Sequence, residues 1–234
     1  MNNEIYIWHH LGLGDHITCN AIVRNYAKMY DKVYLFVKYR NLDNVKYLYR
    51  DLNNIEFIYG KGEQDEFVHF YLMTHPNINL LKLWLSNEKI IESGLKFDEL
   101  FYKEANIPFS KKMEDCFILR DEKIEEQVCK TLNPKNEPYI FVHHDTDRDH
   151  KIDFSHFKNK SLKVIESNFK LEEEKDFLIF HYLKLIENAA EIHVMESSFS
   201  VMIDVFIENH NDAYLHKYVR NIDSIRRPYW KIIN

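Results

Sequence analysis

The chain has 234 residues, enough for one large domain or two small ones, and its 45% hydrophobic and 29% charged residues are typical of an ordinary globular protein. A formal net charge of −6 at pH 7 argues against a general nucleic-acid binder, which would carry a basic surface. The three scattered cysteines form no CxxC pair, which excludes a disulfide framework or a zinc-binding cysteine cluster.

Strands and helices alternate in the first part of the chain. Apolar runs at 4–8, 32–38 and 55–60 predict three strands. Between them, segments 15–30 and 44–52 carry apolar residues at helical spacing. This order is typical of a parallel sheet with crossover helices.

The middle of the chain is predicted to be mostly helical. Within residues 77–107, the stretches 80–86 and 97–107 stand out as helical segments. A short strand is expected from Cys116 to Leu119, and an amphipathic helix and a loop with two prolines follow it.

A second alternating unit begins after that loop. Strands are predicted at 139–145, 161–167 and 191–196, with a helix at 175–190. Another helix begins at Ser197 or Ser198, since serine favours helix starts. The end of the chain offers two further segments: a last strand at 213–219 and a terminal helix or turn at 223–233.

These elements predict an α/β fold made of two Rossmann-like domains with parallel sheets. We place the N-terminal domain at residues 1–115 and the C-terminal domain at 116–234, within a connecting region that extends from about 110 to 136. A single doubly wound sheet is the alternative, because each half is near the lower size limit of a domain.

The segment HHLGLGDHITCNAIVR, residues 9–24, places two of the chain's five glycines, Gly12 and Gly14, between a strand and a helix. Glycine permits positive φ angles and close approach to the backbone, and helix N-termini attract anions. Asp15 and His16 follow at once. A carboxylate here would stay ionised and could act as a general base toward a hydroxyl, so we expect both residues in the catalytic group, with Asp15 as the base.

Other interpretations of this loop stay open. A dinucleotide fingerprint would need a small residue where Ile17 stands and an acid after the second strand, which instead ends FVKYR. A nucleotide-triphosphate P-loop would need GKS or GKT, which is absent. Asp15 could also serve only as a helix cap.

The loop resembles the N-terminal loop of the heptosyltransferase-like glycosyltransferases, and more closely that of a small glycosyltransferase-like group with HLGLGDH. The likeness continues in order through residues 101–121, the strand YIFVHHD and the junction at 193–200. It implies the GT-B architecture, in which two Rossmann-like domains face each other across a cleft. It also implies a metal-independent enzyme with an acceptor-side N-terminal domain and a nucleotide-sugar-binding C-terminal domain. The chain is shorter than those enzymes, and ESSFS replaces their donor-phosphate motif.

Under this resemblance, VHHDTDRDH (142–150) and MESSFS (195–200) are the donor-side candidates. We expect His143, His144 and Arg148 to lie near the diphosphate, with Arg148 neutralising its charge. A solvated polar loop and a His/Asp metal site are the alternatives for this segment, and we assign no metal. The remaining expected donor contacts are Glu196 on the ribose, Ser197 and Ser198 at a helix start, and the backbone of Gly12 and Gly14. Arg24 is expected to support the loop.

The predicted function is that of an inverting glycosyltransferase that moves a sugar from a nucleoside-diphosphate sugar to a glycan, lipid-linked or other hydroxyl acceptor, without a cofactor. We expect no nucleic-acid partner and no transmembrane segment, although peripheral membrane association is compatible with such an acceptor. The start of the chain lacks a signal-peptide pattern, so we expect a cytoplasmic protein. A dinucleotide-binding oxidoreductase or epimerase and a non-catalytic glycan- or nucleotide-binding relative remain alternatives.

Overall fold

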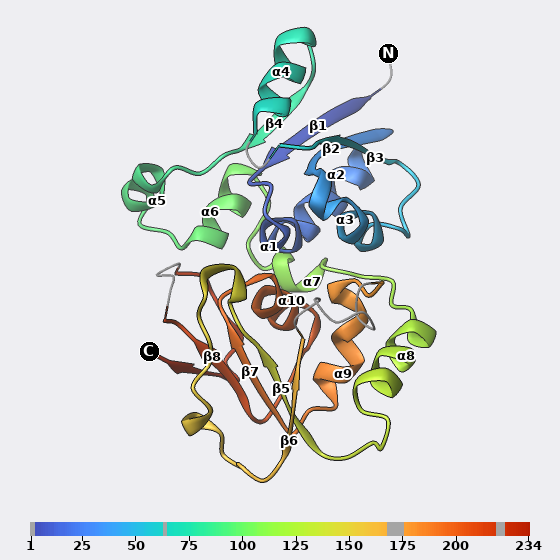
Figure 1. Ribbon diagram of the computed structural model, residues 1–234. Helices are drawn as coiled ribbons and strands as arrows, with labels where there is room; N and C mark the ends of the chain where they lie inside the picture. Colours follow the sequence, from blue (N-terminus) through green and yellow to red (C-terminus); the bar gives the residue numbers. More distant parts are fainter. Residues whose placement is uncertain (1–2, 63–64, 168–175, 219–222) are drawn as a thin grey trace. The chain divides into compact units, whose positions relative to one another are not determined.

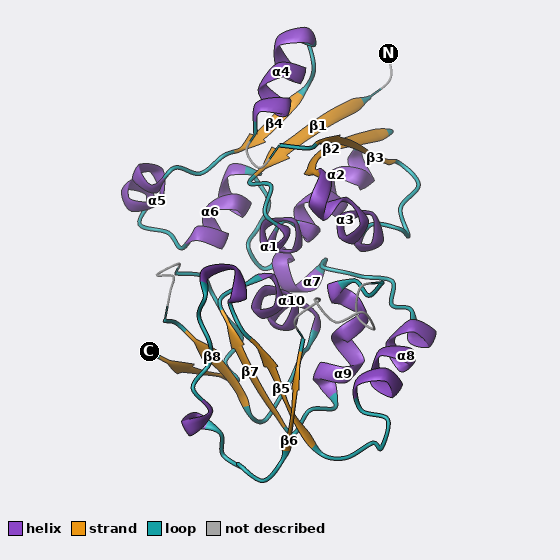
Figure 2. Ribbon diagram, viewed as in Figure 1, coloured by secondary structure: helices purple, strands orange, loops and turns teal. Residues whose placement is uncertain are grey.

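The computed structural model describes residues 3–62, 65–167, 176–218 and 223–234. The chain divides into two compact units (Figure 1). Unit 1 comprises Met1–Leu119 with Asp223–Ile225, and unit 2 comprises Arg120–Ile222 with Arg226–Asn234. Each unit contains one sheet whose strands pair in parallel (Figure 2), so the predicted α/β class with two parallel sheets is confirmed.

The sheet of unit 1 has the order β3-β2-β1-β4. Its strands alternate between two buried faces, as expected for a parallel sheet covered on both sides. Ile7 and Leu35 point to the face that α2 and α3 cover, whereas Trp8 and Phe36 pack with Val68 of α4 on the other. The strands are β1 (Glu4–His9), β2 (Lys32–Lys38), β3 (Ile55–Gly60) and β4 (Leu80–Leu83).

The helices of unit 1 follow its strands in chain order. The predicted helix over 15–30 is two helices, because the backbone leaves the helical conformation at Cys19. The helices are α1 (Leu13–Thr18), α2 (Asn20–Met29), α3 (Leu42–Leu48), α4 (Glu66–Thr74), α5 (Asn87–Ser93), α6 (Phe97–Glu104) and α7 (Lys111–Glu114).

The sheet of unit 2 has the order β6-β5-β7-β8-β9. One face packs against helices: Phe199 of α10 contacts Phe141 of β5 and Tyr182, which precedes α9. The elements are β5 (Tyr139–His143), β6 (Lys163–Glu166), β7 (Glu191–Met195), β8 (Ala213–His216), β9 (Trp230–Ile233), α8 (Glu122–Leu132), α9 (Leu183–Glu187) and α10 (Ser198–Phe206).

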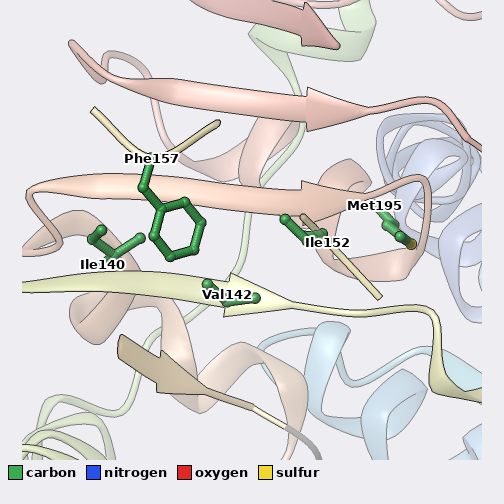
Figure 3. Packing of buried hydrophobic residues seen from close by; sticks show 5 residues of the cluster. All are labelled: Ile140, Val142, Ile152, Phe157 and Met195. Carbon is green, nitrogen blue, oxygen red and sulfur yellow. The ribbon is translucent and has the colours of Figure 1, made fainter. Parts of the chain in front are cut away.

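A loop takes the place of a helix on the opposite face of this sheet. Phe157 and Ile152 from the connection after β5 pack against Ile140, Val142 and Met195 (Figure 3). All five side chains are less than 7% exposed. The connection is therefore fixed by apolar burial and does not need regular helix to hold it on the sheet.

Two predicted elements were wrong. Residues 80–83 form strand β4, because their backbone pairs with β1 from Tyr6 to His9. The segment Cys116 to Leu119 is no strand, since its backbone groups bond to side chains: Phe117 N–H donates to Asn20, and the Leu119 carbonyl accepts from Arg50.

The terminal segment 223–233 contains the predicted turn, at residues 228–229, and then ends in a strand that was not predicted. Residues 230–233 pair with β8, and the indole Nε1 of Trp230 donates to Asp204 at 3.0 Å. Helix 175–190 is shorter than predicted. A 3₁₀ turn at Ile179–Tyr182 leads into α9, and residue 175 lies outside the described residues, as does residue 219 of the predicted last strand.

Candidate functional site

The strand order of unit 2 indicates a candidate ligand-binding edge. Strand β6 pairs with one side of β5, and β7 pairs with the other. Ligands of open parallel sheets bind outside the carboxyl ends of the strands, where successive connections leave in opposite directions. The two predicted donor segments, 142–150 and 195–200, both begin at this point.

Side-chain contacts bring these two segments together. The ring of His143, at the end of β5, stacks on Phe199 of α10 with 4.1 Å between ring centroids. Its Nδ1 lies 3.2 Å from the carbonyl oxygen of Ser167, which follows β6. His143 is half-buried, so part of its side chain is exposed at this edge of the sheet.

The rest of the VHHDTDRDH loop is folded mostly on itself. His144 is 8% exposed, and its Nδ1 accepts the backbone N–H of Ile152 at 3.0 Å. The guanidinium of Arg148 donates to the Asp145 carboxylate at 2.6 Å. The charge of Arg148 is therefore already compensated within three residues, and a phosphate would have to compete with Asp145 for it.

Serines begin α10 at the same edge. Ser197 is the N-cap: its hydroxyl accepts the N–H of Phe199 at 3.2 Å, and its own N–H donates to the Ser200 hydroxyl at 3.1 Å. Ser198 is the first helical residue and is half-buried. Capping and anion binding are compatible here, since capping by Ser197 uses only one of the first N–H groups of α10.

Two cations surround Glu196, which links β7 to α10. The Nζ of Lys217 lies 3.7 Å and a guanidinium nitrogen of Arg226 lies 3.9 Å from Glu196 Oε1. The two cations place positive charge at this edge of the sheet, close to the start of α10. Sequence reasoning missed both residues as site residues, because nothing in their local sequence links positions 217 and 226 to 196.

Unit 1 has its own switch point between β1 and β4. Strand β1 pairs with β2 on one side and with β4 on the other, and His9 is in register with Leu83. After these strands, the ring of His10 stacks on Trp84 with centroids 4.4 Å apart. Trp84 is 39% exposed and presents an aromatic surface that the sequence-based helix prediction for 80–86 did not anticipate.

The glycine loop lies at this edge, and its geometry answers why Gly12 is a glycine. Gly12 is the N-cap of α1 with φ −69° and ψ 148°, which any residue can adopt. A Cβ at Gly12 would lie only 2.6 Å from Asp15 Oδ2. The missing Cβ therefore makes room for the Asp15 carboxylate, so this glycine is used for close approach and not for a positive φ. Gly14 lies in the first turn of α1.

Asp15 and His16 have opposite environments although they are adjacent. Asp15 is half-buried in the first turn of α1, whereas His16 has no exposed surface. The His16 ring meets His9 edge to face at 4.4 Å, and burial lowers its pKa well below the usual 6.5. A side chain without accessible surface cannot contact a substrate, so we remove His16 from the predicted catalytic group.

Arg24 anchors the helix that follows the loop. It is 7% exposed, and its two terminal nitrogens donate to both carboxylate oxygens of Asp51, each at 2.8 Å. Its Nε donates to the carbonyl of Phe117 at 3.0 Å, and NH2 donates to that of Leu48 at 3.1 Å. Such a bidentate, buried network is what a supporting role for Arg24 requires.

The described residues contain neither a metal-binding cluster nor a membrane-spanning helix. No group of three or more His, Cys, Asp or Glu side chains in residues 3–62, 65–167, 176–218 and 223–234 has an arrangement that could hold a metal ion. Within the same ranges, no helix has the length and apolar character required to cross a bilayer. Lys38 ends β2 and Tyr39 follows it, so the acid that a dinucleotide site would place there is missing.

No protein-family model matches the chain, and no curated protein matches it significantly. Solved structures match the chain in their fold. ADP-heptose LPS heptosyltransferase II of Escherichia coli is 9% identical with a TM-score of 0.55, covering 99% of this chain and 90% of that one. A glycosyltransferase family 9 protein of Veillonella parvula is 10% identical with a TM-score of 0.51, covering 99% and 85%.

The iron-containing dodecameric glycosyltransferase TibC of enterotoxigenic Escherichia coli is 10% identical with a TM-score of 0.57. That match covers 98% of this chain but only 62% of TibC. At such identities the likeness concerns architecture, and all three matches extend over both units. The chain therefore has the two-unit α/β fold of the heptosyltransferase-like, GT-B glycosyltransferases.

Proposed function

We propose that this chain is a glycosyltransferase that uses a nucleoside-diphosphate sugar. The observation that carries the proposal is the carboxyl edge of unit 2, where the start of α10 and the cations Lys217 and Arg226 gather at the switch point of the sheet. Helix N–H groups, a helix dipole and cations together suit a diphosphate. The shared fold with solved glycosyltransferases supports the same reaction class.

In this proposal unit 2 holds the leaving group. The diphosphate binds at Ser198 and the following N–H groups of α10, and Lys217 and Arg226, which lie beside Glu196, neutralise its charge. Preorganised positive groups of this kind stabilise the charge that develops as the sugar–phosphate bond breaks. We therefore propose a reaction without a bound metal, and we rank these two cations ahead of Arg148.

Unit 1 supplies the base. The Asp15 carboxylate accepts the proton of the acceptor hydroxyl, and the freed oxygen attacks the anomeric carbon from the face opposite the diphosphate. One bond forms to this carbon as the other breaks, so the configuration inverts and the diphosphate leaves with the bonding electrons. The exposed face of Trp84, near the loop of His10, suits the apolar face of an acceptor sugar.

The test combines nucleotide binding with turnover. Calorimetric titration with ADP, GDP and UDP should give a dissociation constant that rises 10–100-fold in Lys217→Ala and Arg226→Ala, since each loses a charge-assisted contact. Lys231→Ala is the matched control, because Lys231 is also a cation of unit 2 but pairs with Asp212 at 2.7 Å. Equal weakening in all three variants would contradict the phosphate assignment.

Turnover is then measured with a panel of nucleotide sugars in the presence and absence of EDTA. Asp15→Asn should abolish transfer and leave nucleotide affinity unchanged, and EDTA should have no effect. Nucleotide binding without turnover of any donor would instead favour a non-catalytic relative. Full activity of Asp15→Asn would remove Asp15 from the mechanism.

A further inference from the structure

Four polar side chains form a continuous hydrogen-bonded chain through the interior of unit 2. Glu191 and His193 lie on β7, His216 lies on β8, and Tyr218 follows β8. Glu191 Oε2 lies 3.3 Å from His193 Nε2, His193 Nδ1 lies 3.0 Å from His216 Nε2, and His216 Nδ1 lies 2.7 Å from the Tyr218 hydroxyl. We call these four residues the relay. They share the sheet face that carries the apolar cluster of Figure 3.

The acidic end of the relay fixes the direction of its hydrogen bonds. Glu191 is 2% exposed, and its carboxylate accepts the backbone N–H groups of Lys158 at 2.9 Å and Asn159 at 2.8 Å. Both oxygens of this carboxylate therefore act as hydrogen-bond acceptors toward the backbone. A carboxylate accepts hydrogen bonds and does not donate them, so His193 Nε2 carries the proton and donates it to Glu191.

Burial then sets the remaining bonds. Burial lowers the pKa of His193, and burial and the neighbouring His193 lower that of His216 to about 3, so both rings are neutral at pH 7. A neutral ring that donates from one nitrogen accepts at the other. His216 Nε2 therefore donates to His193 Nδ1, and the Tyr218 hydroxyl donates to His216 Nδ1.

The rings of the relay are held in these orientations by their neighbours. Tyr214 stacks on His193 with centroids 4.4 Å apart, and Phe157 lies 4.5 Å from the same ring. The other ionisable groups that act on the two histidines are His144, Asp153, His156 and Asp212.

The far end of the relay reaches the ligand-binding edge. Tyr218 is half-buried and packs against the cluster that contains Met195 and Ile152. The preceding residue, Lys217, is one of the two cations beside Glu196. Because the only proton of the Tyr218 hydroxyl points inward to His216, its oxygen offers lone pairs to whatever binds at this edge.

We propose that Tyr218 is a hydroxyl-selective binding residue whose oxygen accepts a hydrogen bond from a hydroxyl group of a ligand at the carboxyl edge of unit 2. The choice of ligand rests on the proposed function: the hydroxyl belongs to the ribose or to the sugar of a nucleoside-diphosphate sugar. The relay makes Tyr218 an acceptor and so favours hydroxylated ligands over deoxy analogues and over groups that only accept.

The direction of the relay can be tested without any ligand. Long-range ¹H–¹⁵N NMR spectra at pH 7 should show His193 and His216 as neutral rings protonated at Nε2. Tyr218→Phe should keep this tautomer at both rings and move the His216 Nδ1 resonance, because that nitrogen loses its donor. A ring protonated at Nδ1, or a cationic ring, would overturn the proposal.

The binding role is tested with the tightest binder among ADP, GDP and UDP, with its 2′-deoxy and 3′-deoxy forms, and with nucleotide sugars that carry the same base. Tyr218→Phe should weaken the hydroxylated ligand about tenfold and leave the deoxy form that lacks the contacted hydroxyl unchanged. A loss seen only with nucleotide sugars assigns the hydroxyl to the sugar. Tyr214→Phe is the matched control, since Tyr214 lies on β8, just before Tyr218, and its hydroxyl donates to Asp212 and not to the relay.

The outcomes separate the two proposals. Equal weakening of hydroxylated and deoxy ligands, or none at all, in Tyr218→Phe would overturn the hydroxyl-selective site and leave the proposed function intact. Failure of the wild-type chain to bind any of these nucleotides would overturn the proposed function, and the ligand assigned to Tyr218 with it.

Discussion

Because Asp15 lies close to Gly12, we predict that Gly12→Ala lowers the activity strongly but changes the stability little. In Gly12→Ala the new Cβ would lie 2.6 Å from Asp15 Oδ2, and an ordinary contact begins at 3.4 Å, so the carboxylate must move by about 0.8 Å. The backbone at Gly12 is already in a region open to alanine. The free energy of unfolding should therefore change by no more than about 1 kcal/mol.

Activity should respond much more strongly. A misplacement of about 1 Å in a catalytic group costs on the order of 10²-fold in rate, so the turnover number of Gly12→Ala should fall by that factor while nucleotide affinity stays constant. Urea unfolding and a donor-turnover assay measure the two quantities on the same preparation.

Gly94→Ala provides the control with the opposite pattern. Gly94 has φ +64° and no atom within 4 Å of its ideal Cβ, so alanine there strains only the backbone. We expect it to lose about 1 kcal/mol of stability and no activity. Full turnover in Gly12→Ala would refute the argument that the position of Asp15 matters for the reaction.

Three further predictions concern the interior of unit 1. Burial lowers the pKa of His9 to about 4 and that of His16 well below 6.5, so the unfolded chain takes up protons that the folded chain does not. The free energy of unfolding should therefore fall as the pH drops from 6.5 toward 4, by about 3 kcal/mol for His9 alone. A flat profile in urea unfolding across this pH range would contradict the prediction. Asp98→Asn leaves the Lys112 ammonium, 3% exposed, without its carboxylate at 2.8 Å, and should cost about 3–5 kcal/mol in the same unfolding assay. Arg24→Lys cannot reproduce the bidentate pair or reach all the carbonyls, and should cost roughly 2–3 kcal/mol with unchanged nucleotide affinity; a neutral effect would show that the network contributes nothing.

The fold could be predicted where apolar runs were long or bounded by clear turns. The strands at 32–38 and 139–143 are such cases, since their apolar residues fill a sheet buried on both faces. The four-residue run of β4 has no period of its own, and only its pairing with β1 makes it a strand. The terminal strand β9 was missed for the same reason: its pairing with β8 is a tertiary fact.

The sequence predicts which loops form the candidate sites, but not which side chains within them lie together. Parallel strands end at one edge, so polar residues after β5 and β7 were expected to gather, and the stacking of His143 on Phe199 brings their segments together. Which neighbour faces inward is decided by packing, as His16 beside Asp15 illustrates. Lys217 and Glu196 are far apart in the sequence, so no local sequence pattern predicts that they lie close together.

A crystal structure of the chain with a bound nucleoside diphosphate tests the central claim most directly. Our account predicts the phosphates against Ser198 at the start of α10, with the Lys217 ammonium and the Arg226 guanidinium in contact with them. Phosphates bound instead at the loop of Gly12 in unit 1, or anywhere away from the carboxyl ends of β5 and β7, would contradict it.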